Sequence, residues 1–165
     1  MSQLIGDEIG FIHVIASCLA IISGSLVLAV KKGTKFHIRA GYFYVINMAV
    51  LLITALMIYR LFNGWGVFHY MTILSITTLV MGMLPIWFKK PINKWKYLHF
   101  TFMYWSVIGL YAAFAAEVLT RIPDTPFFGM VGVATFGIML SGGVFFGFGR
   151  TSRTSCETGG ILFAW

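Results

Sequence analysis

Charged residues are scarce in this chain: they make up 10% of its 165 residues, whereas 59% of the residues are hydrophobic. Ordinary soluble domains carry about 25% charged and about 45–50% apolar residues. The composition therefore argues against a soluble globular domain, and the high hydrophobicity argues against a disordered chain. Acidic residues are the scarcest charged class, five against twelve basic ones, which leaves a formal net charge of +7.

Cysteine and the common cofactor motifs are equally sparse. The two cysteines, Cys18 and Cys156, stand far apart, one inside an apolar segment and one near the C-terminus, so we expect no disulfide between them. The chain has no CxxC or CxxCH sequence, which excludes covalent c-type haem attachment. It also has no nucleotide or flavin motif, so any reductase chemistry depends on an outside electron donor.

Long hydrophobic runs, in contrast, fill most of the chain. Each is about 20–24 residues long, enough to cross a hydrocarbon core of about 30 Å as a helix, and none alternates in polarity as barrel strands do. A signal peptide has basic residues before its apolar run, whereas Asp7 and Glu8 precede the first run here. We therefore do not expect this run to be a cleaved signal peptide. We predict an all-α integral membrane protein with one transmembrane domain, residues 1–150, and a cytoplasmic tail, residues 151–165. The predicted spans are 11–30, 36–59, 67–88, 97–119 and 127–148.

The basic residues gather on one side of this predicted topology. Ten of the twelve lie in the loops after the first and third spans and in the tail, while Arg60 and Arg121 lie on the other side with most of the acidic residues. The positive-inside rule then places the N-terminus outside and the C-terminus in the cytoplasm. We expect a bacterial inner (plasma) membrane. The net charge is thus a topology signal, and nucleic acid is not an expected partner.

The four histidines form the most informative pattern. His13, His37, His69 and His99 each lie near the start of a different predicted span, from the first to the fourth. Because consecutive spans are antiparallel, His13 and His69 share the outer level and His37 and His99 the inner one. Each half of the chain also contains a histidine, then a Lys-Lys pair, then a second histidine. In the first half 17 residues separate the first histidine from the pair and 4 separate the pair from the second histidine. In the second half the corresponding numbers are 19 and 8.

Two histidine pairs at two depths suit two b-type haems, because haem iron takes axial imidazoles from opposite faces of a flat ring. Parallel helices of a four-helix bundle can supply each pair, and the two irons would be roughly 20 Å or less apart. Ionisable residues at membrane depth are functional by default. Three alternatives stay open. They are a zinc or copper site, which usually needs three or four ligands at one point, a proton path through His and Glu, and histidines without a cofactor.

This pattern resembles the cytochrome b561 class of transmembrane electron-transfer proteins, in which paired histidines of a central four-helix bundle hold two b haems. The sixth helix common in that class is absent. The stretch His37–Tyr44 (HIRAGYFY) also resembles the His-Arg-x-x-Gly-Arg-x-Tyr helix start of a bacterial membrane family of unknown function (number 2306), with the first Arg one position later and the second Arg absent. The stretch His99–Tyr104 stands where that family has a second His-led helix start.

Other residues are fainter candidates. Lys35, Arg39, Lys94 and Lys96 lie near the inner histidines and could bind haem propionates, an anionic reductant such as ascorbate, or lipid phosphate. Orientation of the protein by the positive-inside rule is the favoured explanation for them. Tyr104 sits deeper in the fourth span, against a flat ligand or in the core. Glu117 and Arg121 have the i,i+4 spacing of an ion pair. Glycines recur in the fifth span and predict close helix packing, within the chain, in a homo-oligomer or in a larger complex.

The predicted function is transmembrane electron transfer by a b561-like membrane oxidoreductase. Two haems held by His13 with His69 and by His37 with His99 would carry electrons from a cytoplasmic or quinol donor to an outer acceptor such as ferric iron. The alternative is a non-redox protein, either a small transporter or a packing subunit of a larger membrane complex.

Overall fold

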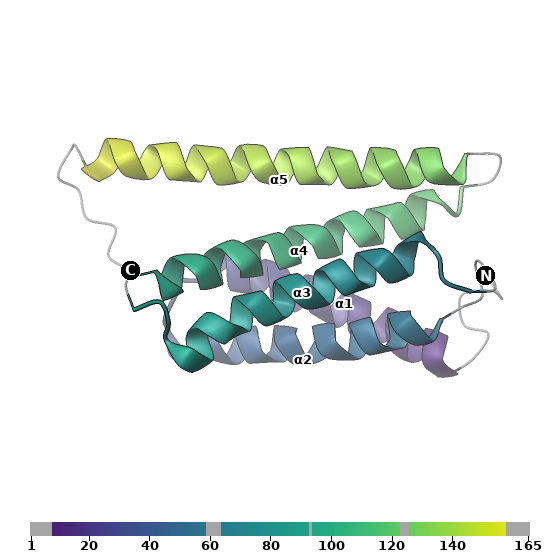
Figure 1. The fold of residues 1–165 in the computed structure, drawn as a ribbon, viewed down its shortest axis with the longest axis horizontal. Coiled ribbons are helices and arrows are strands. Elements are labelled where there is room, and N and C mark those ends of the chain that lie inside the picture. The colour runs from purple at the N-terminus through teal and green to yellow at the C-terminus, as the bar shows by residue number, and fades with distance from the viewer. Residues whose placement is uncertain (1–7, 59–63, 93, 123–125, 158–165) are drawn as a thin grey trace. The chain divides into compact units, whose positions relative to one another are not determined.

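The computed structural model describes residues 8–58, 64–92, 94–122 and 126–157, and all the regular structure in these ranges is helical (Figure 1). Each of the five helices contains a stretch long and apolar enough to cross a membrane. The chain is therefore an all-α integral membrane protein. The helices are α1 (Glu8–Ala29), α2 (Lys35–Met57), α3 (Val67–Phe88), α4 (Trp95–Leu119) and α5 (Phe127–Glu157).

The predicted spans agree with the helices, with differences at their ends. The bounds of α3 are as predicted, whereas α1 begins three residues earlier and α4 two residues earlier than the apolar runs. Helix α5 continues to Glu157, so the first part of the expected tail is helical, and residues 158–165 lie outside the described ranges. Backbone hydrogen bonding does not stop where the apolar sequence stops, which is why hydropathy places these ends only approximately.

The chain divides into two compact units, residues 1–110 and residues 111–165. The first unit contains α1, α2, α3 and the N-terminal part of α4, so it holds all four histidines. Helix α2 packs against both α1 and α3, and short loops make consecutive helices antiparallel (Figure 1). The second unit contains the remainder of α4 and all of α5.

The middle of the first unit is closely packed by side chains. Tyr44 and Met48 of α2 and Val107 of α4 are almost completely buried, and the Tyr44 hydroxyl hydrogen-bonds the Ser106 hydroxyl at 2.9 Å. Gly24 of α1 faces this cluster, since a Cβ there would lie 3.0 Å from the Tyr44 ring. Small residues of this kind let membrane helices approach closely. Protein side chains therefore fill the space beside Gly24.

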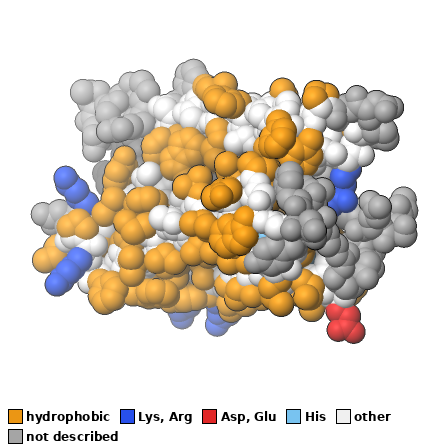
Figure 2. All heavy atoms as spheres, turned by 45° about the vertical axis from the view of Figure 1, so that its right-hand side comes forward, with side chains coloured by type: hydrophobic (Ala, Val, Ile, Leu, Met, Phe, Trp, Pro, Cys, Tyr) orange, Lys and Arg blue, Asp and Glu red, His pale blue; other side chains and the backbone are white. Residues whose placement is uncertain are grey.

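The outward faces of the helices are apolar. Hydrophobic side chains cover most of the described surface in view in Figure 2, and the few Lys and Arg side chains lie toward its edges. On α1 and α2, for example, Ile22, Ile46 and Ile53 are each at least 60% exposed. Exposed apolar surface of this extent suits lipid contact and would be a liability in water. The four histidines do not lie on these exposed apolar faces.

Candidate functional site

The four histidines occupy two ends of the first unit. Helices α1 and α3 begin at one end, which we call the His13/His69 end, and α2 and α4 begin at the other, the His37/His99 end. Thr54, the residue that binds His13, lies 17 positions after His37 along α2, a rise of about 25 Å. The closely packed Tyr44 lies between them. The alternation predicted from the spacing is thus present in the helices.

His99 of α4 is held against the backbone of α3. Its Nδ1 lies 2.7 Å from the carbonyl oxygen of Gly82, and since a carbonyl only accepts, Nδ1–H is the donor. Pro85 of α3 has no N–H, so the carbonyl of Met81, the residue before Gly82, loses its intrahelical hydrogen bond. The His99–Gly82 bond fixes the tautomer of His99 and leaves a lone pair on Nε2.

The close approach of α4 to α3 at this point depends on Gly82. A Cβ at Gly82 would lie 2.7 Å from Sδ of Met103 and 3.4 Å from the Met103 backbone nitrogen. Any side chain here would therefore push the two helices apart or displace Met103. Gly82 thus contributes twice, through its carbonyl to the orientation of His99 and through its missing side chain to the helix spacing.

His37 lies in the first turn of α2, which Thr34 caps. Oγ1 of Thr34 accepts a hydrogen bond of 3.1 Å from the His37 backbone N–H, the arrangement expected of a threonine N-cap. The His37 ring is half-buried, and its Nδ1 is buried with no hydrogen-bond partner in the part of the chain that the structure describes. Lys32 and His99 both lie close enough to act electrostatically on this ring. The structure therefore brings His37 and His99 near one another.

Lys32 does not reach outward from this end. Its Nζ donates to the carbonyl oxygens of Val27, Leu28 and Val30 at 3.1, 2.6 and 3.2 Å. These carbonyls belong to the C-terminal turn of α1 and the residue after it, where a cation is favourable. Lys32 thus caps the C-terminal end of α1, close to His37.

At the opposite end, His13 binds the side chain of Thr54 across the α1–α2 hairpin. The distance from Nδ1 to Oγ1 is 3.0 Å. The single proton of the Thr54 hydroxyl is directed to its own helix, toward the Val50 and Leu51 carbonyls at 2.9 Å, so Thr54 accepts and His13 Nδ1–H donates. The His13 lone pair is then on Nε2, as in His99.

His69 has the opposite hydrogen-bonding role. It is 4% exposed, and its Nδ1 accepts a hydrogen bond of 3.2 Å from the backbone N–H of Gly66. A neutral imidazole that accepts at Nδ1 carries its proton on Nε2. The ring of Trp65 lies beside it, with centroids 5.4 Å apart. His69 caps the start of α3 and is not arranged like His13 and His99.

These observations test which histidines fit the axial positions of a b-type haem. A ligating imidazole usually donates its other N–H to a carbonyl or another acceptor, which orients the ring and raises its basicity. His99 meets this requirement, and His37 adds a buried ring nitrogen without a protein partner close to it. The His37/His99 end therefore fits. At the other end His13 fits, but Nε2 of His69 becomes a ligand only if its bond to Gly66 is lost.

A zinc site of the usual kind does not fit the described residues. No group of three or more His, Cys, Asp or Glu side chains comes together in the described ranges. Structural zinc has four protein ligands and catalytic zinc three. Pairs of histidines, one at each end, remain the arrangement that needs an explanation.

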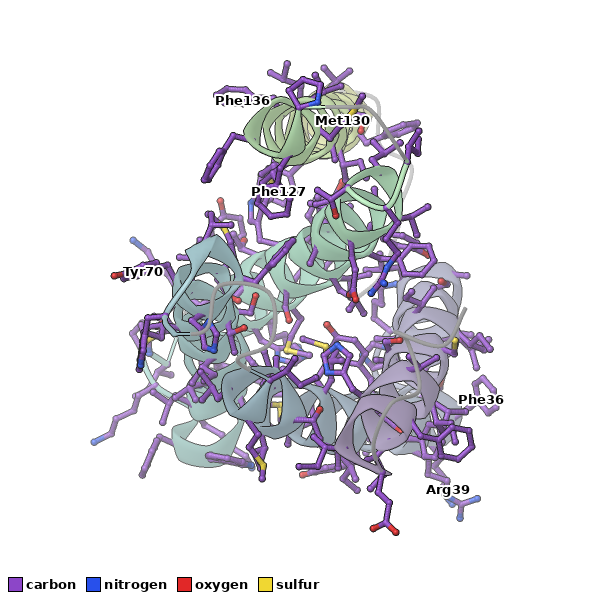
Figure 3. The ribbon with its side chains drawn as sticks, turned by 90° about the vertical axis from the view of Figure 1, so that its right-hand side faces the viewer. Phe36, Arg39, Tyr70, Phe127, Met130 and Phe136 are labelled. Atoms are coloured by element: carbon purple, nitrogen blue, oxygen red, sulfur yellow. The ribbon has the colours of Figure 1, made fainter. Side chains whose placement is uncertain are left out.

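The other predicted cofactor residues lie around the histidines rather than between them. Lys35 and Arg39 are exposed at the start of α2, and Figure 3 shows Arg39 pointing outward. Lys96 is exposed as well, with Nζ 5.5 Å from the Trp95 ring. Tyr104 is half-buried, with ring centroids 6.1 Å from Phe100 and 5.7 Å from Trp105. The three cations are positioned for solvent, headgroups or anionic molecules.

One pairing predicted from spacing is confirmed in the second unit. Nη2 of Arg121 lies 2.7 Å from Oε1 of Glu117, and both side chains are partly exposed. Two functional groups were missed by sequence reasoning, the Gly82 carbonyl and the Thr54 hydroxyl. Pro85 signals a lost backbone hydrogen bond at Met81, next to Gly82, whereas nothing in the sequence around Thr54 marks it as the partner of His13.

Comparison with protein families agrees with the membrane assignment. A family model described as "Predicted membrane protein (DUF2306)" matches residues 10–146. Those residues include all four histidines and most of the five helices. Neither a curated protein nor a solved structure matches the chain.

Proposed function

We propose that this chain, which belongs to the DUF2306 family of predicted membrane proteins, binds b-type haem and transfers electrons within the membrane. The observation that carries the proposal is the His37/His99 end, where His99 donates Nδ1–H to the Gly82 carbonyl close to the unpartnered Nδ1 of His37. In a bis-histidine haem site the protein supplies two imidazoles, here from different helices. One of them, that of His99, is oriented by a backbone carbonyl.

In this proposal His37 and His99 would hold one haem, and His13 and His69 would hold a second. Bound b-type haem supplies one-electron redox chemistry at its iron. Gly82 orients the His99 ring, and Thr54 orients His13. Lys35, Arg39 and Lys96, exposed near the first pair, would bind propionates or an anionic donor through charge-assisted hydrogen bonds.

The expected topology would place each histidine pair near one of the two proposed redox partners. The basic loops after α1 and α3 would face the cytoplasm by the positive-inside rule, so His37 and His99 would be nearer a cytoplasmic or quinol donor. His13 and His69 would be nearer an outer acceptor such as ferric iron. Because the sequence contains no nucleotide or flavin motif, the electrons would come from an outside donor.

A second candidate is a non-redox packing subunit of a larger membrane complex. It is favoured by the middle of the first unit, where Tyr44, Met48 and Val107 already fill the interior. It is also favoured by the exposed phenylalanines Phe128, Phe136 and Phe145 of α5, each more than 70% exposed. An exposed apolar helix surface of this kind suits contact with other membrane helices as well as with lipid.

The visible spectrum of the detergent-purified protein separates the two candidates. The oxidised and dithionite-reduced forms are recorded, and haem is quantified as its pyridine haemochrome. The electron-transfer proposal predicts one or two b haems per chain with the sharp reduced α-band of six-coordinate iron. A protein that stays colourless after expression with added haem contradicts it and favours the packing subunit.

A further inference from the structure

An open cavity lies between α3 and α4 at the His37/His99 end of the first unit. Its volume is about 510 Å³, within the range of ligand sites. Helix α3 contributes Leu84 and Pro85, helix α4 contributes Leu98 and Phe102, and the loop between the helices contributes Lys90. We call it the α3–α4 groove.

The lining of the groove is apolar apart from one cation. Lys90 is the only charged residue among those that form it, and it lies at the loop end, where the apolar spans give way to basic sequence. Lys89 and Lys94 lie beside it, and both are exposed. The groove thus combines an apolar channel along the spans with a cationic mouth at the level where a bilayer changes from acyl chains to headgroups.

The loop that carries these lysines is ordered by backbone hydrogen bonds. The Pro91 carbonyl oxygen accepts from the backbone N–H groups of Lys94 and Trp95, at 2.9 and 3.0 Å. These bonds join the loop to the start of α4. Lys90 directly precedes this hydrogen-bonded turn and lies at the mouth of the groove.

We propose that the α3–α4 groove binds an anionic phospholipid, with an acyl chain between Leu84 and Phe102 and the phosphate against Lys90. Charge complementarity favours an anionic headgroup over a zwitterionic one, because basic side chains near a membrane surface attract anionic lipid. A quinol is disfavoured, since no carboxylate or imidazole lines the groove to accept its protons. The proposal is independent of haem binding, and a colourless protein would leave it intact.

Native mass spectrometry of the full chain in detergent tests the proposal. The probes are phosphatidylglycerol and phosphatidylcholine with identical acyl chains, and thermal stabilisation by each lipid is the second readout. We expect phosphatidylglycerol to bind more tightly and to stabilise the protein more. Lys90→Gln should weaken phosphatidylglycerol binding about fivefold. The matched control is Lys31→Gln, since Lys31 is exposed in the loop after α1 and lies outside the groove.

A second variant tests the apolar part of the groove. Leu84→Trp fills the groove and should reduce lipid binding, whereas Ile53→Trp places the same side chain on an exposed face of α2 and should not. Inorganic phosphate should not displace the lipid, and displacement would indicate a simple anion site. Equal binding of both lipids, equal losses in Lys90→Gln and Lys31→Gln, or a lipid-free dimer that Leu84→Trp dissociates would each overturn the proposal.

Discussion

The two ends of the first unit each carry one histidine pair, yet different hydrogen bonds hold the two pairs. At the His37/His99 end, His99 donates to a backbone carbonyl and His37 has a buried nitrogen without a protein partner in the described chain. At the other end, His13 donates to Thr54 while His69 accepts from Gly66. Histidines at matching positions in the sequence therefore differ in which nitrogen can bind a metal. The number of histidines alone does not make a site.

The largest expected effect is the loss of haem in His99→Ala. Removing this ligand should abolish haem binding at the His37/His99 end, and His37→Ala should remove the same haem. His69→Ala should cost less, because His69 must first lose its bond to Gly66. Pyridine haemochrome quantification of each variant measures the loss, with Cys18→Ser, at an exposed free cysteine, as the control. A greater loss in His69→Ala than in His99→Ala would reverse the comparison.

The next effect concerns the backbone that orients His99. In Gly82→Ala the new Cβ would meet Sδ of Met103 at 2.7 Å, so either the Met103 side chain or α4 must shift, and a shift of α4 lengthens the His99–Gly82 bond. Haem affinity at this end should fall about 10–100-fold, the usual cost of losing an orienting partner. Haem titration of the purified apoprotein gives the affinity. Gly41→Ala is the control, since its Cβ would meet nothing within 4 Å, and an equal loss in both variants would contradict the assigned role of Gly82.

The region between the two ends should respond in stability alone. Tyr44→Phe removes the buried hydrogen bond to Ser106 and should lower the free energy of unfolding by about 1 kcal/mol, within the range for hydrogen bonds between membrane helices. Unfolding in mixed micelles measures it, and haem content should stay at the wild-type value. If haem content fell as well, Tyr44 would belong to a cofactor site.

The smallest effect is expected at Thr54. Thr54→Val keeps the shape of the side chain but removes the acceptor of His13 Nδ1–H, and should lower stability by about 0.6 kcal/mol. Thr54→Ser keeps the hydroxyl and should remain near the wild type. The ¹⁵N resonances of the His13 ring report which nitrogen carries the proton. An unchanged ring spectrum in Thr54→Val would show that Thr54 does not set the tautomer.

Much of the fold was predictable because membrane helices follow from apolar length. The spans, their number and the alternation of the histidines all came from composition along the chain, and the Glu117–Arg121 pair came from helical spacing. The ring partners were not predictable, since Thr54 and the Gly82 carbonyl reach His13 and His99 only through contacts between helices. For the same reason, only the structure shows that Tyr44 and Met103 occupy the space beside Gly24 and Gly82.

The hydrogen bonds of the α1–α2 hairpin have a consequence for biogenesis. The Lys32 bonds to the end of α1, the Thr34 cap of α2 and the His13–Thr54 bond all lie within residues 13–54. The hairpin contains every group needed to make them, so it can close in the membrane as soon as α2 has left the translocon. Helices α3 and α4, which carry His69 and His99, can then pack against this closed hairpin.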